Sequence, residues 1–348
     1  MRRRKLVKEE NFGMLFIKDP HFRFGMKFPS GRKETYFEEI EAKVDDLIAI
    51  GKRKNINKLA IAGDIFDIKQ PSLWSGKSVT KNHRILQKLN KQFDIYTIAG
   101  NHDLIGSARS NKKESMYSHF TESKLLIDIH DKPQKFDNIY LYGIDFNSDI
   151  SKLKREIKAI DTEALKIKQD NPKAKVILMF HEHLYPNNLK DDNEKKYVGS
   201  SFNYRYLATN YKNIDVFNAG HLHRGFPTEE YRGKTFINNW GFTRLARSHY
   251  TLDGSHTPTA VLLTIKANRS PKTLNAITFE DIPLKTADFN NSIDIDVMMK
   301  ELKQEMDIGD FLNNIEDFDI KDGEELDMKT LPLEVKNKIE HYLEKINN

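Results

Sequence analysis

Short apolar runs alternate with amphipathic segments through the first 280 residues, and this alternation most constrains the fold. GMLFIKD (13–19) has the length of a buried strand, whereas apolar residues recur at helical spacing over about 34–53. Strands that alternate with helices build central sheets covered by helices, so the sequence predicts an α/β fold. The other expected strands lie at 57–64, 93–100, 138–145, 175–180, 215–220, 234–240 and 259–266, and the other helices near 78–92 and 150–160.

Composition excludes several classes of protein. The 348 residues include no cysteine, which excludes disulfide scaffolds, thiol nucleophiles and cysteine metal sites. No run of about 18 apolar residues occurs, so we expect no transmembrane helix. The basic start MRRRKLVKEE has no apolar stretch behind it, which argues against a secretory signal. The composition is typical of a soluble protein of the cytoplasm.

The net charge of +5 hides an uneven distribution along the chain. Residues 1–287 contain 49 Lys and Arg against 34 Asp and Glu, whereas residues 288–348 contain 7 against 17. A basic body favours a polyanionic partner such as nucleic acid. Solvated lysine-rich faces would produce the same balance, so charge alone leaves both interpretations open.

The character of the chain changes after about residue 283. ITFEDIPLKT reads as a last strand, and helical patterns follow at about 295–306 and 333–346, with an acidic stretch between them. We therefore expect a main domain over residues 1–270 and a small capping and helical region over 271–348. The helices either dock on a partner or cap the same domain.

Polar side chains follow five of the expected strands, at the point where each strand ends. The carboxyl ends of strands in open α/β sheets are where ligands bind, so five such clusters are expected to converge. The clusters are Asp19 and His21 in DPH; Asp64 and Asp67 in GDIFD; Asn101, His102 and Asp103 in GNHD; His181 and His183; and His221 and His223 in GHLH.

These residue types suit a pair of divalent cations. Residues i and i+2 of an extended backbone project to the same side, so Asp19 with His21, and His221 with His223, are each expected to aim at one place. The glycines before Asp64, Asn101 and His221 are expected to allow tight turns. Imidazole, carboxylate and amide ligands without sulfur suit manganese, iron or zinc. Two ions ~3.5–4 Å apart activate water and hold a phosphate during in-line displacement.

The series DPH, GDIFD, GNHD, a strand-terminal histidine and GHLH resembles the calcineurin-like metallophosphoesterase superfamily over about residues 13–245. The resemblance implies a sandwich of two β-sheets flanked by helices. It also implies one metal held by Asp19, His21, Asp64 and His223, and a second held by Asp64, Asn101, His181 and His221. His102 would then contact the phosphate and protonate the leaving oxygen as general acid.

Outer segments resemble the SbcD-type branch, the nuclease subunit of the SbcC–SbcD DNA repair complex. GDIFDIKQPS, FINNWGFTRLAR and ITFEDIPLKT carry this likeness, and the chain is closer in size to phage members. The resemblance implies a DNA exonuclease or endonuclease with two Mn²⁺ ions, Fe or Zn being alternatives. The implied partners are DNA, an SbcC-like coiled-coil ABC-type ATPase bound through the C-terminal helices, and a second copy of the chain. The predicted dimer helices lie near 78–92 and 113–126.

Two other functions fit the same motifs. One is a related phosphoesterase that acts on phosphoproteins or nucleotides. The other is a catalytically silent scaffold, which the retention of all seven expected ligands and His102 disfavours. The roles of Asp67 and His183 stay open, because each could contact substrate, support a ligand or simply be hydrogen-bonded in the fold. The polar loop 184–204 is either a flap beside the site or an ordinary insertion.

Overall fold

The computed structural model describes residues 11–29, 32–33, 35–130, 132–187, 202–243, 256–266 and 276–285. Two compact units make up the chain. The first contains nearly all the described residues, including both large sheets, and it is the unit considered below. The described part of the second comprises residues 27–29, 32–33, 35–42 and 256–257. The predicted helices at 295–306 and 333–346, and most of the loop 184–204, lie outside the described residues.

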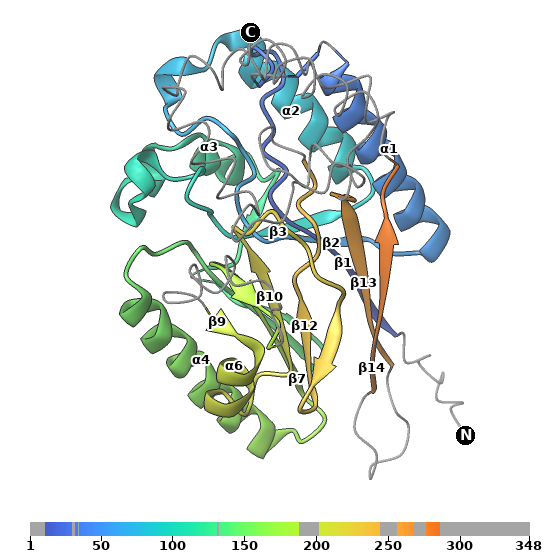
Figure 1. Ribbon diagram of the computed structural model, residues 1–348, viewed down its shortest axis with the longest axis vertical. Coiled ribbons are helices and arrows are strands. Elements are labelled where there is room, and N and C mark those ends of the chain that lie inside the picture. The colour runs from blue at the N-terminus through green and yellow to red at the C-terminus, as the bar shows by residue number, and fades with distance from the viewer. Residues whose placement is uncertain are drawn as a thin grey trace, which may run out of the picture. The chain divides into compact units, whose positions relative to one another are not determined.

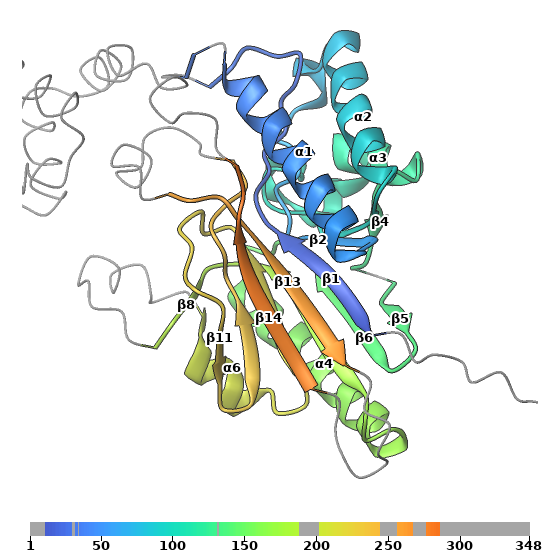
Figure 2. The same cartoon turned by 90° about the vertical axis from the view of Figure 1, so that its right-hand side faces the viewer.

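The first sheet has six strands in the order β14-β13-β1-β2-β3-β4. Its centre is parallel, because β1 pairs with β2, β2 with β3 and β3 with β4 in the same direction, whereas β13 runs antiparallel to β1 and β14 antiparallel to β13 (Figure 2). The strands are β1 (Phe12–Ile17), β2 (Lys58–Ile61), β3 (Asp94–Thr97), β4 (Ile127–Asp128), β13 (Thr259–Lys266) and β14 (Ala276–Pro283).

The second sheet also has six strands, in the order β11-β12-β10-β7-β6-β5. Its four central strands are parallel, and β11 and β5 add antiparallel edges. The strands are β5 (Gln134–Phe136), β6 (Ile139–Ile144), β7 (Lys175–His181), β10 (Val216–Gly220), β11 (Glu229–Tyr231) and β12 (Lys234–Ile237). A separate short pair joins β8 (Leu184–Tyr185) to β9 (Phe202–Asn203).

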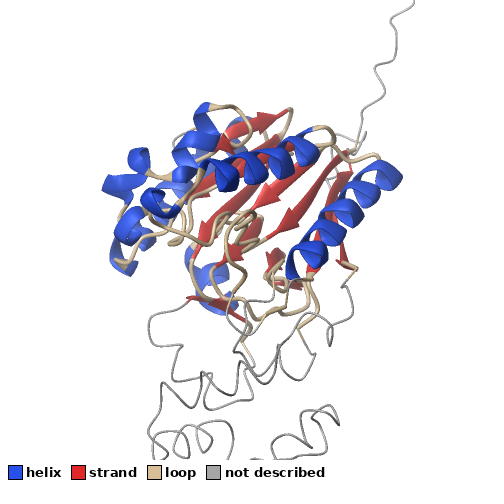
Figure 3. Ribbon diagram, turned by 90° about the horizontal axis from the view of Figure 1, so that it is seen from above, coloured by secondary structure: helices blue, strands red, loops and turns tan. Residues whose placement is uncertain are grey.

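The helices lie on either side of the strands, as Figures 1 and 3 show. Side-chain caps start four of the described helices. The capping side chains, which accept hydrogen bonds from backbone N–H groups of the first turn, are Ser75, Ser115, Asp149 and Asn203. The α-helices are α1 (Tyr36–Lys54), α2 (Gly76–Asn90), α3 (Met116–Glu122), α4 (Ile150–Asp170) and α6 (Tyr204–Asn210). Three short 3₁₀ helices are η1 (Pro71–Leu73), η2 (Ile105–Ser107) and η3 (Arg109–Glu114).

Two apolar layers hold this unit together. The layer between the sheets joins residues of both, among them Phe16 of β1, Ile98 after β3 and Ile177 of β7, all with no exposed surface. On the other face of the second sheet, Leu153 and Ile157 of α4 pack with strand residues such as Phe180. Burial of such side chains is the main favourable term in folding. The two-sheet α/β sandwich predicted from the sequence is therefore confirmed.

Several elements differ from the predictions in extent. The helix predicted near 150–160 continues to Asp170, because Ala164 and Ile167 extend its packed face. The last predicted strand, β14, pairs with β13 along its whole length, so the described residues that follow position 270 begin as part of the first sheet. The domain boundary at 270 stays a prediction. The helix expected near 113–126 is present as the shorter α3. Sequence patterns missed α6 and the short strands β4, β5, β8, β9 and β11, which are too brief to show a periodicity.

Candidate metal centre

The carboxyl ends of five strands bring the predicted side chains together. Strands β1, β2 and β3 are parallel neighbours in the first sheet, and β7 and β10 are parallel neighbours in the second. The two edges meet where the Nδ1 atom of His181 lies 2.7 Å from the backbone oxygen of Ala62. A Cβ added to Gly220 would lie 1.9 Å from this same oxygen, so only glycine allows the approach.

The backbone at these strand ends is left-handed, not extended. Asp19, His21, Asp64 and His221 have φ values of 50°, 44°, 49° and 78°. The prediction that an extended i, i+2 backbone aligns the paired ligands is therefore wrong for these residues, because each turns sharply as it leaves its strand. Of the three glycines expected to turn tightly, only Gly63 has a left-handed φ, at 85°. Non-glycine residues in this region are uncommon and gather at functional sites.

A first group of side chains contains His21, Asp64 and His223. The Nε2 atoms of the two histidines face each other at 3.0 Å, and the Nε2 of His21 lies 3.5 Å from Oδ2 of Asp64. Asp19 lies at the same strand ends. Its Oδ1 accepts a hydrogen bond from the backbone N–H of His221, whereas its Oδ2 is buried without a hydrogen-bond partner. A buried carboxylate oxygen in this position is a ready cation ligand.

A second group contains Asp64, His181 and His221. The Nε2 of His181 lies 3.3 Å from Oδ2 of Asp64 and 3.2 Å from Oδ1 of Asn101. Because the Nδ1 of His181 bonds the backbone oxygen of Ala62, its Nε2 is the atom directed at the centre. Asp64 thus belongs to both groups, as a bridging carboxylate requires.

The protonation states of these groups follow from burial and from their neighbours. Burial opposes ionisation of Asp64, but the adjacent His181 and His21 outweigh it and hold the pKa of the Asp64 carboxyl well below its usual value. Burial likewise opposes protonation of His181, but Asp64 raises the pKa of this imidazole to about 9. Burial and neighbouring histidines lower the pKa of His221 to about 2 and that of His223 to about 4.

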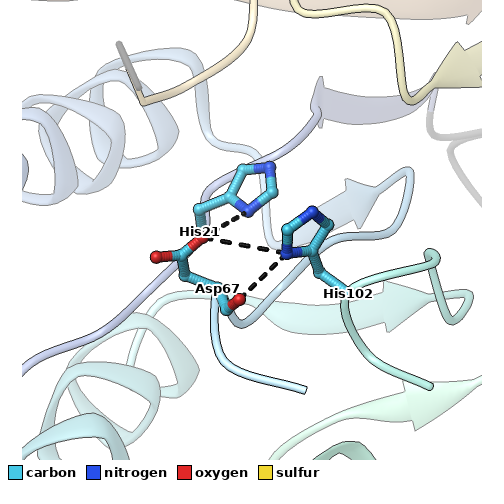
Figure 4. A group of neighbouring side chains, drawn as sticks. All are labelled: His21, Asp67 and His102. Carbon is cyan, nitrogen blue, oxygen red and sulfur yellow. Dashed lines mark hydrogen bonds and ion pairs between the residues drawn. The ribbon is translucent and has the colours of Figure 1, made fainter. Parts of the chain in front are cut away.

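His102, the predicted acid, lies beside the first group together with Asp67 (Figure 4). Its Nδ1 bonds the backbone oxygen of Asp67 at 2.9 Å, and its side chain is 32% exposed. The Asp67 carboxylate lies 3.5 Å from Nδ1 of His21 and 2.5 Å from Nη1 of Arg23. The sequence left the role of Asp67 open. The structure places this carboxylate beside His21 and Arg23, whereas the backbone oxygen of Asp67 holds the ring of His102.

Sequence reasoning missed the part played by Asp103, although the residue stands in the GNHD motif. The residue is buried, and its carboxylate accepts hydrogen bonds from the backbone N–H groups of Ile65, Phe66 and Gly100. It therefore ties the loop after β2 to the loop after β3. Burial raises the pKa of Asp103 to about 7. No sequence signal separates a carboxylate that bonds backbone from one that binds a cation.

Two basic residues close to the motifs in the sequence are engaged in ion pairs. Arg109 pairs with Glu156 at 2.6 Å, and Lys112 pairs with Asp128 at 2.5 Å and with Asp145 at 2.6 Å. These cations hold loops in place. By contrast, His183 lies at the second group: its ring stacks on that of His221, with centroids 4.4 Å apart.

The donor set fits a pair of divalent cations. It combines three kinds of borderline-to-hard ligand around one shared carboxylate, and it includes a buried carboxylate oxygen that no hydrogen bond satisfies. The facing imidazole nitrogens of His21 and His223, 3.0 Å apart, are also close enough to bind one ion. The identity of the metal does not follow from these residues.

Comparison with known proteins agrees with this geometry. The family model for calcineurin-like phosphoesterases matches residues 15–225, which is more than half of the chain. The chain belongs to the calcineurin-like phosphoesterase family. This membership implies a metal-dependent hydrolase. No curated protein matches the sequence.

Two solved structures illustrate the remote similarity. A "Putative 5'-Nucleotidase" from Staphylococcus aureus is 14% identical, with a TM-score of 0.45; the match covers 85% of this chain and 58% of that protein. The calcineurin-like phosphoesterase YfkN from Bacillus subtilis is 12% identical, also with a TM-score of 0.45, and the match covers 88% and 98%. The chain thus spans less than two thirds of the Staphylococcus protein. Among the described residues, no helix is long and apolar enough to cross a membrane.

Proposed function

We propose that this calcineurin-like phosphoesterase is a two-metal phosphodiesterase that cleaves DNA, as the nuclease subunit of an SbcC–SbcD-like repair complex. The observation that carries the hydrolytic part is the sharing of Asp64 by two ligand groups, with His102 beside them. The basic charge of residues 1–287 supports a polyanionic substrate, because cationic side chains bind backbone phosphates regardless of sequence.

In this proposal each side chain has a distinct task. Asp19, His21 and His223 would hold one cation, Asn101, His181 and His221 would hold the other, and Asp64 would be shared by both. When bound, the two divalent cations, which we expect to be Mn²⁺, supply an activated water and neutralise charge on the phosphate.

His102 donates a proton from Nε2 to the leaving oxygen, because its Nδ1 is occupied by the backbone oxygen of Asp67. The backbone oxygen of Asp67 keeps the ring of His102 in place, and its carboxylate, held by Arg23, lies beside His21.

The partners are also proposals. An SbcC-like coiled-coil ABC-type ATPase would bind through the C-terminal helices, which lie outside the described residues. For the proposed homodimer, Ile85, Leu86, Tyr117 and Phe120 are buried within the single chain and therefore pack in its own core. Val79 and Met116 stay partly exposed on the same helices and are the better anchors for a second copy.

The test compares two substrates with the purified protein and Mn²⁺. We expect cleavage of duplex DNA that exceeds hydrolysis of p-nitrophenyl phosphate, and no cleavage after chelation of the metal. Strong phosphomonoesterase activity without cleavage of DNA would contradict the nuclease and favour the related phosphoesterase acting on phosphoproteins or nucleotides. Absence of both activities in the metal-loaded protein would support a silent scaffold.

A further inference from the structure

Phe146 stands next to the second ligand group without belonging to it. It lies just after β6, and its ring centroid is 5.5 Å from that of His221 and 6.1 Å from that of His181. The side chain is only partly buried. Because Phe146 keeps part of its surface exposed beside these histidines, a ligand bound at this edge could lie against its ring.

The backbone of Phe146 is fixed on both sides. Its N–H donates to the backbone oxygen of Ala99 at 2.8 Å, and its own oxygen accepts from Nε of Arg109 at 2.8 Å. Arg109 is itself anchored by Glu156 at 2.6 Å and by the backbone oxygen of Asp145. A ring on so constrained a backbone loses little conformational freedom when a flat ligand binds against it.

His183 adds a second ring at the same place. It follows β7, the neighbour of β6 in the sheet, and stacks on His221 with an interplanar angle of 19°. Its side chain is 27% exposed. Its backbone is also held, because its N–H donates to Glu182 at 2.7 Å and its oxygen accepts from the N–H of Phe202 at 3.0 Å. Phe146 and His183 therefore form an aromatic rim around His221, which we call the ring rim.

The ring rim lies beside the second ligand group, whereas the proposed acid, His102, lies beside the first. His102 contacts His21 and Asp67, whereas Phe146 and His183 contact histidines of the second group. A phosphodiester carries two ester-linked groups, which we call its arms. The arm that leaves must face His102. The arm that stays on the phosphate is then the one available to the ring rim.

We propose that Phe146, flanked by His183, is a stacking subsite for the nucleobase on the retained arm of a phosphodiester, and this rests on the proposed phosphodiesterase function. A nucleobase fits because every base has a π-face, and stacking on phenylalanine needs no specific hydrogen bond. The subsite would therefore select nucleotidyl esters over simple alkyl esters without selecting a base sequence.

The test uses two esters with the same leaving group. In thymidine 5′-(p-nitrophenyl phosphate) and ethyl p-nitrophenyl phosphate, water attacks phosphorus and p-nitrophenolate departs, so only the retained arm differs. Phe146→Leu keeps apolar volume and removes the ring. We expect this variant to lose about tenfold in kcat/KM for the thymidine ester and less than about twofold for the ethyl ester. Phe146→Tyr should behave like the wild type.

Binding and a matched variant complete the experiment. With ethyl p-nitrophenyl phosphate as reporter, Phe146→Leu should raise the inhibition constant of thymidine 5′-monophosphate about tenfold and leave that of inorganic phosphate unchanged. Phe136→Leu, also at a partly buried phenylalanine of the same sheet but at its other end in β5, should change neither constant.

The outcomes separate the two proposals. Equal losses on both esters, or no loss on either, would overturn the subsite and assign Phe146 to packing around the histidines, while the phosphodiesterase would stand. If the metal-loaded wild type hydrolyses neither ester, the proposed phosphodiesterase function is contradicted. The subsite proposal, which rests on that function, is then contradicted as well.

Discussion

The same strands build two regions of opposite character. Between the sheets, β1, β3 and β7 contribute a dry layer that includes Phe16 and Ile177. A few residues further along, Asp19 and His181 follow or end these strands and are equally buried. The interior layer buries mostly apolar side chains against one another. The carboxyl edge instead buries charged groups and residues with left-handed backbone at one place.

This difference separates stability from function. Apolar residues between the sheets gain free energy from leaving water, and their loss leaves cavities. The polar edge costs free energy in the empty protein, because its carboxylates and imidazoles are desolvated without full mutual satisfaction. We therefore expect substitutions in the layer to weaken folding and substitutions at the edge to weaken metal binding and catalysis.

The largest effect is expected from Asp64→Asn, which removes the shared charge of both ligand groups. Metal content should fall and kcat/KM should drop by about a thousandfold or more, since metal-ion catalysis contributes several kcal/mol. Asp137→Asn is the matched control, because Asp137 is also an aspartate with a left-handed φ, 52°, but is exposed in the turn between β5 and β6. Full activity in Asp64→Asn would contradict the expectation that substitutions at the carboxyl edge weaken metal binding and catalysis.

His102→Ala should lower kcat by about 10²- to 10⁴-fold, the range typical of general acid catalysis. Two metals should remain bound per chain, because the backbone N–H of residue 102, which bonds Asp64 at 2.8 Å, is unchanged by the substitution. Steady-state kinetics and metal analysis measure the two effects. Unchanged cleavage would remove the acid from the mechanism, and loss of both metals would make His102 a ligand.

Ile177→Ala tests the interior layer. We expect it to lower the free energy of unfolding by ~2–5 kcal/mol, whereas Ile177→Val should cost only ~0.5–1.5 kcal/mol. Urea denaturation measures both values. Metal affinity of the folded protein should match that of the wild type. A variant that folds stably but fails to bind metal would show that the layer and the edge are not separable.

The smallest effect concerns pH in the metal-free protein. The folded-state pKa of His181, about 9, is higher than that of an unfolded histidine, so its protonated form stabilises the fold. This contribution is fully present below pH ~6.5 and is lost as pH rises through about 9.

The difference in unfolding free energy between the wild type and His181→Asn should therefore shrink from pH 6 to pH 9. For His221 and His223 the sign is opposite. Their lowered pKa values, about 2 and about 4, mean that falling pH favours the unfolded chain, which takes up protons first. A difference for His181→Asn that grows with pH would contradict the assignment of a proton to this residue.

Much of the fold and of the candidate centre could be predicted from the sequence, for a physical reason. Five polar clusters placed directly after apolar strands are expected to converge at one edge, so Asp64 and His181 could be predicted from their order in the chain. The local geometry was not predictable: the left-handed turns at Asp19 and His221 depend on contacts between the two sheets.

Roles that depend on the folded loops could not be predicted. Asp67 bonds through both its backbone oxygen and its carboxylate, and Asp103 bonds three backbone N–H groups of distant segments. Phe146 reads in the sequence as one more apolar residue of a strand. Likewise Leu86 and Phe120 show only that a helix face is apolar, and the structure shows that this face belongs to the core.

The most direct measurement is anomalous diffraction from crystals of the protein soaked in Mn²⁺. We predict two peaks per chain, ~3.5–4 Å apart and on either side of the Asp64 carboxylate, one bordered by His21 and His223 and the other by His181 and His221. Crystals that show no peak at Asp64, or a single ion bound elsewhere, would contradict the two-metal centre.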